Sequence, residues 1–263
     1  MRYFIAVVLA IIVSWGVSVG TAHAATPQLY GAHRGEKWPS PYTQDSSLAI
    51  NAAIADPVAW FVESDARATK DGLGVMQHDE SLTVSTHCSG NVADSTRDRL
   101  LNQCPMLDGS QIQTVEEYVS AVAGHKHAML HVKTRTATFR AYLAKVLLAT
   151  AGAQTYIRPL LGSVAEVKAW QALLPGWWFE LGVSGVLSSA QVQSVKALGS
   201  HVRAMVIPAG QPGAVPSTWW SGLTAAHIPV DYVTYNHGQD VQSHNPVFGR
   251  VLSSNIPATQ AAV

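Results

Sequence analysis

The chain has 263 residues, of which 48% are hydrophobic and 13% are charged, and 17 Lys and Arg residues balance 17 Asp and Glu residues. This apolar content can fill a sizeable core, and it excludes a chain that is disordered throughout. The balanced charge argues against a nucleic-acid partner held by bulk charge and against strong adsorption to an anionic membrane.

The first 24 residues have the pattern of a secretory signal peptide. Arg2 supplies a positive start, an apolar run covers residues 4–19, and the small-x-small motif Ala22-His23-Ala24 follows. The alternative is a membrane anchor, but the run is short for a span of about 20 residues and no basic cluster follows it. We therefore expect cleavage after Ala24, a secreted protein and no stable membrane anchor.

After this segment, short β-rich runs alternate with runs of helical period. Strands are expected at residues 29–33, 60–65, 128–133, 156–161, 177–183, 201–207, 231–235 and 250–253, with a short extended segment at 74–78. Helices are expected at 45–55, 115–123, 137–151, 164–174, 190–198 and 219–226. Eight such β/α-type units predict a (β/α)8 TIM barrel, which is an α/β fold, as a single domain over residues 25–263.

The longest stretch expected to be irregular, residues 85–105, reads as an insertion in the loops after the second strand. It contains both cysteines of the chain, Cys88 and Cys104. An even number of cysteines in an exported chain predicts one disulfide, and the alternative is two free buried thiols. The bond would close a loop of about 17 residues and contribute about 3 kcal/mol to stability.

Charged side chains gather at the ends of the first two strands. The first strand ends in His33-Arg34-Gly35, and the second carries Glu63 and Asp65, which are two residues apart and therefore face the same side. Two carboxylates on one face repel each other unless a proton or a cation lies between them, and hard divalent metals prefer such oxygen ligands. The alternative is that both carboxylates are solvated or salt-bridged at the surface. This alternative is weaker because an interior strand of a barrel leaves little room for solvated charges.

The third strand carries His131 and Lys133, again two residues apart. Imidazole can ligate a metal and an ammonium group can hold a phosphate oxygen, although an inward-facing His is more often structural. A functional role for this pair is better supported because the carboxyl ends of neighbouring barrel strands meet at the active site. His78, shortly after the second strand, would join His33 beside the metal as a general acid and base pair.

These motifs resemble the glycerophosphodiester phosphodiesterase family, which uses HRG, ExD, TKDG and HD in this order and at similar spacing. The matching segments are His33-Arg34-Gly35, Glu63-Ser64-Asp65, Thr69-Lys70-Asp71-Gly72 and His78-Asp79. Looser similarity continues toward the C-terminus in Val233-Thr234-Tyr235-Asn236 and Ser254-Asn255-Ile256-Pro257.

The resemblance implies a barrel that hydrolyses glycerophosphodiesters, small-molecule or lipid-derived, to glycerol 3-phosphate and an alcohol. It implies one divalent metal ion (Ca, Mg, Mn or Zn) on Glu63 and Asp65. His33 and His78 would be the acid–base pair. The phosphate charge would be stabilised by Arg34 and Lys133.

The chain departs from the family on the third strand, where His131 stands in place of a Glu. A His ligand keeps coordination possible but removes one negative charge, which shifts the preference from Ca or Mg toward Zn or Mn. Gln44 and Asp45 replace the Glu and the Asn of a P-E-N-T motif.

Two alternatives therefore stay open beside a glycerophosphodiesterase. One is a lipid phosphodiesterase similar to sphingomyelinase D or phosphatidylinositol phospholipase C, which exposed apolar loops at the mouth would favour. The other is a catalytically weakened barrel that binds a phosphorylated ligand. The oligomeric state, the released alcohol and the choice of acid or base between the histidines also stay open.

Overall fold

The structure is a computed structural model that describes residues 29–35, 40–207, 217–234 and 250–253. The predicted signal peptide lies outside the described residues, as do Tyr235-Asn236 and the motif at 254–257.

In the described part of the chain, eight parallel strands form a closed barrel. They are β1 (Leu29–Ala32), β2 (Ala59–Ala68), β4 (His127–Val132), β5 (Ile157–Leu161), β6 (Phe179–Val183), β7 (Val202–Val206), β8 (Val230–Thr234) and β9 (Arg250–Ser253). Each strand pairs with the next of these in the chain, and β9 pairs with β1 to complete the ring. A short strand, β3 (Gly74–Met76), pairs antiparallel with the last residues of β2. The predicted (β/α)8 TIM barrel is confirmed.

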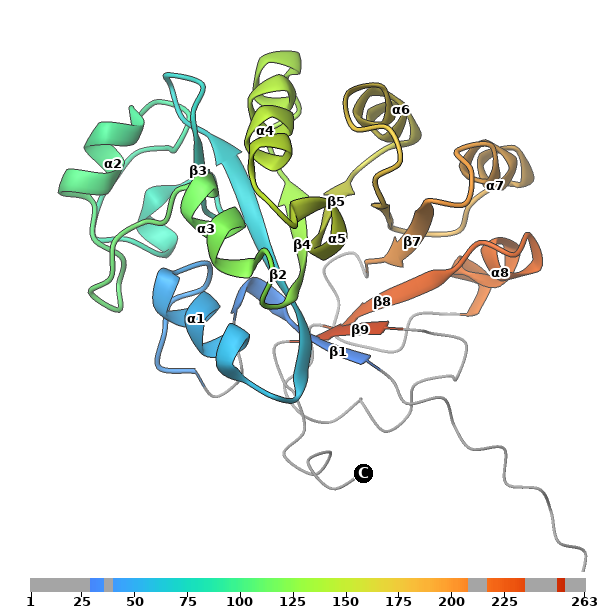
Figure 1. The fold of residues 1–263 in the computed structure, drawn as a ribbon, viewed down its shortest axis with the longest axis horizontal. Coiled ribbons are helices and arrows are strands. Elements are labelled where there is room, and N and C mark those ends of the chain that lie inside the picture. The colour runs from blue at the N-terminus through green and yellow to red at the C-terminus, as the bar shows by residue number, and fades with distance from the viewer. Residues whose placement is uncertain (1–28, 36–39, 208–216, 235–249, 254–263) are drawn as a thin grey trace, which may run out of the picture.

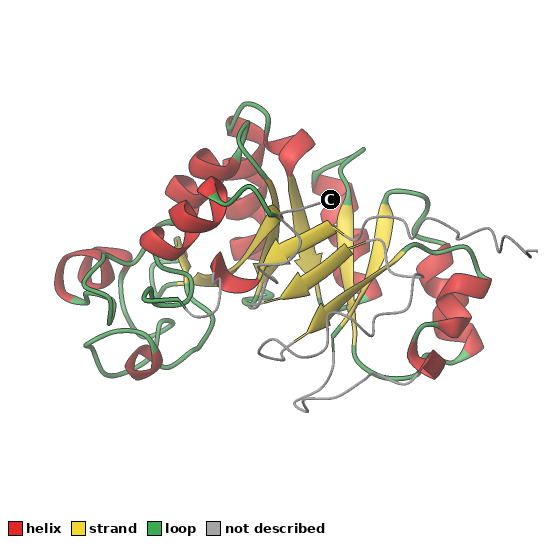
Figure 2. Ribbon diagram, turned by 90° about the horizontal axis from the view of Figure 1, so that it is seen from below, coloured by secondary structure: helices red, strands yellow, loops and turns green. Residues whose placement is uncertain are grey.

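Helices pack against the outside of the strands (Figures 1 and 2). They are α1 (Ser47–Ala55), α3 (Val115–Val122), α4 (Ala137–Ala149), α5 (Ala153–Tyr156), α6 (Val164–Leu173), α7 (Ser189–Lys196) and α8 (Ser221–Ala225). A further helix, α2 (Arg97–Gln103), lies beyond β3, away from the barrel (Figure 1). Three 3-10 turns accompany them: η1 (His33–Gly35), η2 (Leu82–Val84) and η3 (Ser217–Trp219).

Side-chain caps explain why most of these helices begin where they do. A Ser or Thr oxygen accepts a hydrogen bond from an amide of the first turn in α1, α2, α3, α4, α6 and α7. Thr114 and Glu117 form a full capping box at the start of α3. Among the described helices, none combines the length and the apolar character that crossing a bilayer requires.

The core has an outer layer between strands and helices and a smaller layer inside the barrel. The inner layer consists of Phe61, Met129, Leu160 and Met205, all at most 2% exposed. Gly31 on β1 makes room for it, because a Cβ atom there would lie 2.2 Å from the Phe61 ring. The barrel is therefore filled below its carboxyl-end mouth.

Most predicted segments match the structure to within a few residues, but two differ. The second strand extends to Ala68, beyond the predicted end at Asp65, because β3 pairs with its last residues. Residues 85–105 were expected to be irregular, and this was wrong: they contain α2. This helix is short and polar and has one buried side chain, Leu100, so it shows no apolar period.

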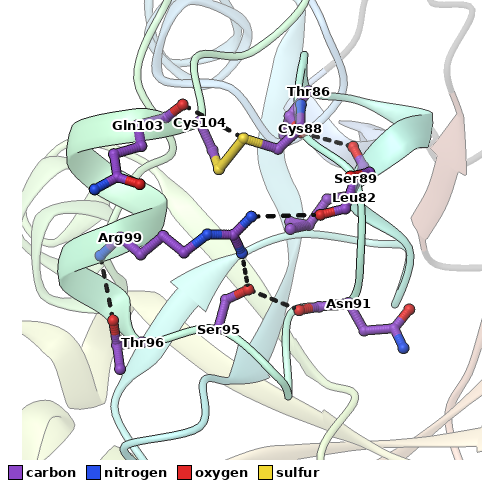
Figure 3. The surroundings of a disulfide bond; sticks show 10 residues. All are labelled: Leu82, Thr86, Cys88, Ser89, Asn91, Ser95, Thr96, Arg99, Gln103 and Cys104. Atoms are coloured by element: carbon purple, nitrogen blue, oxygen red, sulfur yellow. Dashed lines mark hydrogen bonds between the residues drawn. A yellow bond between two sulfur atoms is a disulfide. The ribbon is translucent and has the colours of Figure 1, made fainter.

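Residues 80–110, which we call the insertion, form a unit with its own small core beside β3. This core comprises Val75, Leu82, Val92, Leu100, Cys104, Met106 and Ile112. The predicted disulfide between Cys88 and Cys104 is present, with the Cα atoms 5.3 Å apart, and it ties the end of α2 to the preceding loop (Figure 3). Arg99 reinforces the same connection through hydrogen bonds to Ser95 Oγ and the Ser89 carbonyl.

Candidate active site

The chain turns sharply where β1 ends, and this turn directs His33 into the barrel mouth. Arg34 and Gly35 both adopt left-handed conformations, with φ of 55° and 71°. Gly35 is required there because a Cβ atom would lie 2.8 Å from the backbone nitrogen of Ile50 in α1. His33 is consequently 8% exposed, with Nε2 3.8 Å from Glu63 Oε2.

Glu63 and Asp65 face the same mouth from β2, as the two-residue spacing predicted. Asp65 lies opposite His131 in the register of β2 and β4. His131 Nδ1 is 2.9 Å from Asp65 Oδ1 and 3.7 Å from Glu63 Oε1. Lys133 Nζ lies 3.3 Å from Asp65 Oδ1. The structure thus brings the expected ligands and the expected lysine together.

Gln44 connects the two sides of this cluster. Its amide oxygen accepts a hydrogen bond from an Arg34 guanidinium nitrogen at 2.5 Å, and its amide nitrogen donates to Asp79 Oδ2 at 2.8 Å. Asp79 Oδ1 in turn lies 3.1 Å from His78 Nδ1. A neutral amide is suited to this place because it donates to one partner and accepts from the other.

The loop before α1 also supplies a third buried carboxylate, Asp45. Its Oδ1 accepts hydrogen bonds from the Ser64 hydroxyl at 2.5 Å and from the Asp65 amide at 3.1 Å. Two hydrogen bonds connect this loop to the insertion. The Thr43 amide donates to Asp108 Oδ2 at 2.9 Å, and the Asp108 amide donates to Thr43 Oγ1 at 3.0 Å. The insertion therefore helps to position Gln44 and Asp45.

Three buried carboxylates in one mouth cannot all be ionised without compensating charge. Burial raises the pKa of Glu63 well above its usual range, and neighbouring Asp65 raises it further. Burial and Asp65 likewise raise the pKa of Asp45 to about 8. Burial also disfavours ionised Asp65, but His131 and Lys133 outweigh it and hold its pKa well below its usual range. Without a metal, these shifts therefore favour the protonated forms of Glu63 and Asp45.

Both histidines are neutral at neutral pH in the metal-free protein. Burial lowers the pKa of His33 to about 3, and the neighbouring Arg34 guanidinium acts in the same direction. Burial also lowers the pKa of His78, although the charges of Asp65 and Asp79 oppose the shift. A neutral imidazole can accept a proton, so either residue has the state that a general base needs.

The donor set fits one divalent cation. One ligand atom each from Glu63, Asp65 and His131 lies within 4.8 Å of the others. Asp65 Oδ2 is buried and accepts no hydrogen bond from the described residues, and the raised pKa of Glu63 shows that its carboxylate lacks a compensating charge, which a cation would supply. Two carboxylates and an imidazole form a mixed oxygen and nitrogen set of the kind that Mn or Zn accepts.

A cavity of about 360 Å³ opens beside His131 and Lys133, over the carboxyl ends of β4 to β7. Its lining comprises Arg67, His131, Lys133, Arg135, Leu161, Gly162, Gly182, Val183, Ser184 and Ile207. Arg67 and Arg135 were not among the predicted site residues. The signal for Arg67 was available, because it lies two residues beyond Asp65 on the same strand, whereas Arg135 lies in the loop after β4.

Comparison with known protein families identifies the chain. The family model described as the glycerophosphoryl diester phosphodiesterase family matches residues 33–197, more than half of the chain. The chain belongs to this family. It is therefore a phosphoric diester hydrolase, as the motifs of the first two strands predicted. A search of curated proteins found no match.

Solved structures agree with the fold of this family member. A glycerophosphoryl diester phosphodiesterase from Parabacteroides distasonis is 21% identical, with a TM-score of 0.68 over 88% of this chain and 84% of that one. An Oleispira antarctica phosphodiesterase in complex with the product sn-glycerol-3-phosphate is 18% identical, with a TM-score of 0.68 over 87% and 93%. A glycerophosphodiester phosphodiesterase from Agrobacterium tumefaciens is 14% identical, with a TM-score of 0.66 over 87% and 97%.

Proposed function

We propose that the protein is an exported, metal-dependent glycerophosphodiester phosphodiesterase that uses His33 and His78 as its acid–base pair. The observation that carries the proposal is the juxtaposition of the Glu63, Asp65 and His131 ligand atoms with two neutral imidazoles in one barrel mouth. Export is supported by the pattern of residues 1–24 and by the disulfide, which is typical of oxidising compartments.

Glu63, Asp65 and His131 would hold the cation, which when bound polarises the phosphoryl oxygens and lowers the pKa of an attacking hydroxyl or water. Arg34 and Lys133 lie 3.7 Å and 3.3 Å from Asp65 oxygens and supply positive charge beside the ligands. Their role is to stabilise the negative charge that the phosphoryl group gains in the transition state.

The two histidines differ in a way that assigns their roles in this proposal. His33 is almost fully buried and uncharged in the metal-free protein, which is the state from which an imidazole can accept the proton of the attacking hydroxyl or water. His78 is 25% exposed, and the charges of Asp65 and Asp79 oppose the lowering of its pKa by burial, so it can take up a proton from solvent more readily than His33. His78 therefore donates the proton to the leaving alcohol oxygen.

The direct test is hydrolysis of glycerophosphocholine, glycerophosphoinositol and glycerophosphoglycerol by the mature protein, with glycerol 3-phosphate as the measured product. We expect that chelation abolishes activity and that a divalent ion restores it, with Mn or Zn more effective than Ca or Mg. Circular dichroism before and after chelation controls for unfolding. Full activity after exhaustive chelation would contradict the metal site.

The His131→Glu variant tests the ligand that departs from the family pattern. A carboxylate there adds one negative charge and a hard oxygen donor, so activity should shift toward dependence on Ca or Mg. Metal titrations of both proteins, read by activity and by calorimetry, measure the shift. An unchanged metal preference would remove His131 from the ligand set.

A second candidate, a phosphodiesterase acting on intact lipid, is favoured by apolar side chains on the insertion and the facing loop. Val84 and Leu107 are each 50% exposed and Tyr42 is 36% exposed. The Leu107 amide donates to the Ser85 carbonyl at 3.0 Å, which places Leu107 beside the segment of Val84. The Thr43 amide donates to Asp108 Oδ2 at 2.9 Å, which places the loop of Tyr42 beside Leu107. Lysolipid and sphingomyelin vesicles in the same assay distinguish the candidates, since a Leu107→Ser variant should lose vesicle activity only.

A further inference from the structure

Two arginines extend the charged rows of the active site toward the cavity. Arg67 follows Glu63 and Asp65 on β2, and Arg135 follows His131 and Lys133 just after β4. Both line the cavity that opens beside the expected metal ligands. Because the rows run from the expected metal ligands into this cavity, the arginines would face the part of a bound substrate that lies beyond its phosphate.

The two arginines differ in how firmly they are held. Arg67 donates to the His78 carbonyl at 2.9 Å and pairs with Glu80, and its side chain is 17% exposed. Arg135 is 58% exposed, and its Nε lies 3.6 Å from Glu166 Oε1, beyond hydrogen-bond distance. Arg135 is therefore the guanidinium with donors available for a ligand.

The end of β5 is shaped around Arg135. A Cβ atom on Gly162 would lie 2.2 Å from an Arg135 guanidinium nitrogen, so the glycine leaves the space in which this group lies. The Gly162 amide donates to Glu166 Oε2 at 3.0 Å, which holds the carboxylate beside the guanidinium. The space at Gly162 and the nearby Glu166 carboxylate therefore position the Arg135 guanidinium over the end of β5.

The lining offers one guanidinium beyond the groups proposed to bind the phosphodiester, because Arg67 is paired with Glu80 whereas Arg135 lies 3.6 Å from Glu166 without a hydrogen bond to it. A phosphodiester carries one negative charge, and the proposed cation, Arg34 and Lys133 already face it. The ten described lining residues include Arg67 and Arg135 but no Asp or Glu. They also include no aromatic ring on which a quaternary ammonium could stack. The lining therefore favours an anionic group over a cationic one.

We propose that the substrate arm entering this cavity carries a second anionic group, a carboxylate or a phosphate, which Arg135 binds. This inference rests on the proposed phosphodiesterase function. The volume of about 360 Å³ is enough for a short alcohol with such a group, and the small residues Gly162, Gly182 and Ser184 are part of its lining. A guanidinium suits either anion because it can donate two parallel hydrogen bonds.

Four matched diesters of glycerol 3-phosphate test the proposal, with propan-1-ol, 3-hydroxypropanoate, 3-phosphopropan-1-ol and choline as the alcohols. The kcat/KM for each is measured from released glycerol 3-phosphate in the presence of the activating metal. We expect about tenfold or more preference for at least one anionic alcohol over propanol, as a charge-assisted hydrogen bond supplies. Comparing the carboxylate with the phosphate identifies the anion.

The Arg135→Gln variant should reduce the ratio of anionic to propanol kcat/KM to about one. Arg140→Gln on α4 is the matched control, because it removes the same charge outside the cavity lining and should keep the wild-type ratio. Equal rates for anionic and propanol diesters, or an unchanged ratio in Arg135→Gln, would overturn the inference and leave the diesterase function standing. If no diester is hydrolysed with any metal, both fail together.

Discussion

The two sides of the barrel place their charged residues at opposite ends. On β1, β2 and β4 the charges lie at the carboxyl ends, where three buried carboxylates meet histidines and cations. On β5 to β8 the strands begin with ion pairs: Arg158 Nη1 lies 3.3 Å from Glu180 Oε1, and Arg203 Nη2 lies 2.7 Å from Asp231 Oδ1. The carboxyl ends of β5 and β6 instead lead into Gly162 and Ser184, which border the cavity.

This difference indicates that the carboxyl ends of β1, β2 and β4 serve the reaction, whereas the ion pairs at the beginnings of β5 to β8 stabilise the fold. The first side gathers like charges, which shifts pKa values and leaves buried oxygens without hydrogen-bond donors. The second side alternates the sign of its charges from strand to strand, so that each carboxylate is paired. Barrel enzymes commonly keep chemistry at the carboxyl-end face and stability at the other. The following predictions test that separation.

The largest effect is expected from the histidines on the reactive side. His33→Gln or His78→Gln should lower kcat by about 10²–10⁴-fold, because general acid–base catalysis supplies a factor of this size. His201→Gln, an exposed histidine between β6 and β7, is the control and should keep the wild-type kcat. Circular dichroism checks folding, and near-native rates in either variant would refute the acid–base assignment.

On the other side, Asp231→Asn should lower the free energy of unfolding by about 3 kcal/mol, because it leaves the partly exposed Arg203 without its counter-charge. We expect kcat to stay within about twofold, since the pair lies at the opposite end of the strands. Urea denaturation and steady-state kinetics measure the two quantities. A large loss of kcat without loss of stability would show that the two ends of the barrel are coupled.

Replacing both Cys88 and Cys104 with Ser should lower stability by about 3 kcal/mol, because the disulfide closes a loop of about 17 residues. Thermal unfolding of the wild type with and without reductant should show the same difference. Reductant should leave the double variant unchanged, which controls for effects elsewhere. Equal stability of the oxidised and reduced proteins would mean that the insertion folds without its crosslink.

The smallest effect concerns the contact between the insertion and the catalytic loop. Asp108→Ala removes the acceptor of the Thr43 amide, and we expect kcat/KM to fall about fivefold, equivalent to one hydrogen bond of about 1 kcal/mol. Asp108→Asn retains an acceptor oxygen and should restore most of the activity. If both variants are fully active, the insertion does not position Gln44.

Local patterns were sufficient to predict the reactive side of the barrel. Glu63 with Asp65, and His131 with Lys133, are two residues apart on strands, so their common direction follows from the strand period alone. The same rule would have found Arg67, which continues the row on β2, but not Arg135, which lies in the loop after β4 where the strand period no longer applies. The short helix α2 could not be found in this way, because its residues show no apolar period.

The amino-acid sequence by itself determined the alternation of strands and helices, the pairing of two cysteines and the direction of the strand-end side chains, since all depend on short-range spacing and composition. Only the tertiary structure decided that Gln44 joins Arg34 to Asp79 and that Asp108 holds Thr43 from 65 residues away. It also decided that Gly162 leaves space for Arg135. These contacts join different strands and loops, so they exist only once the barrel has closed.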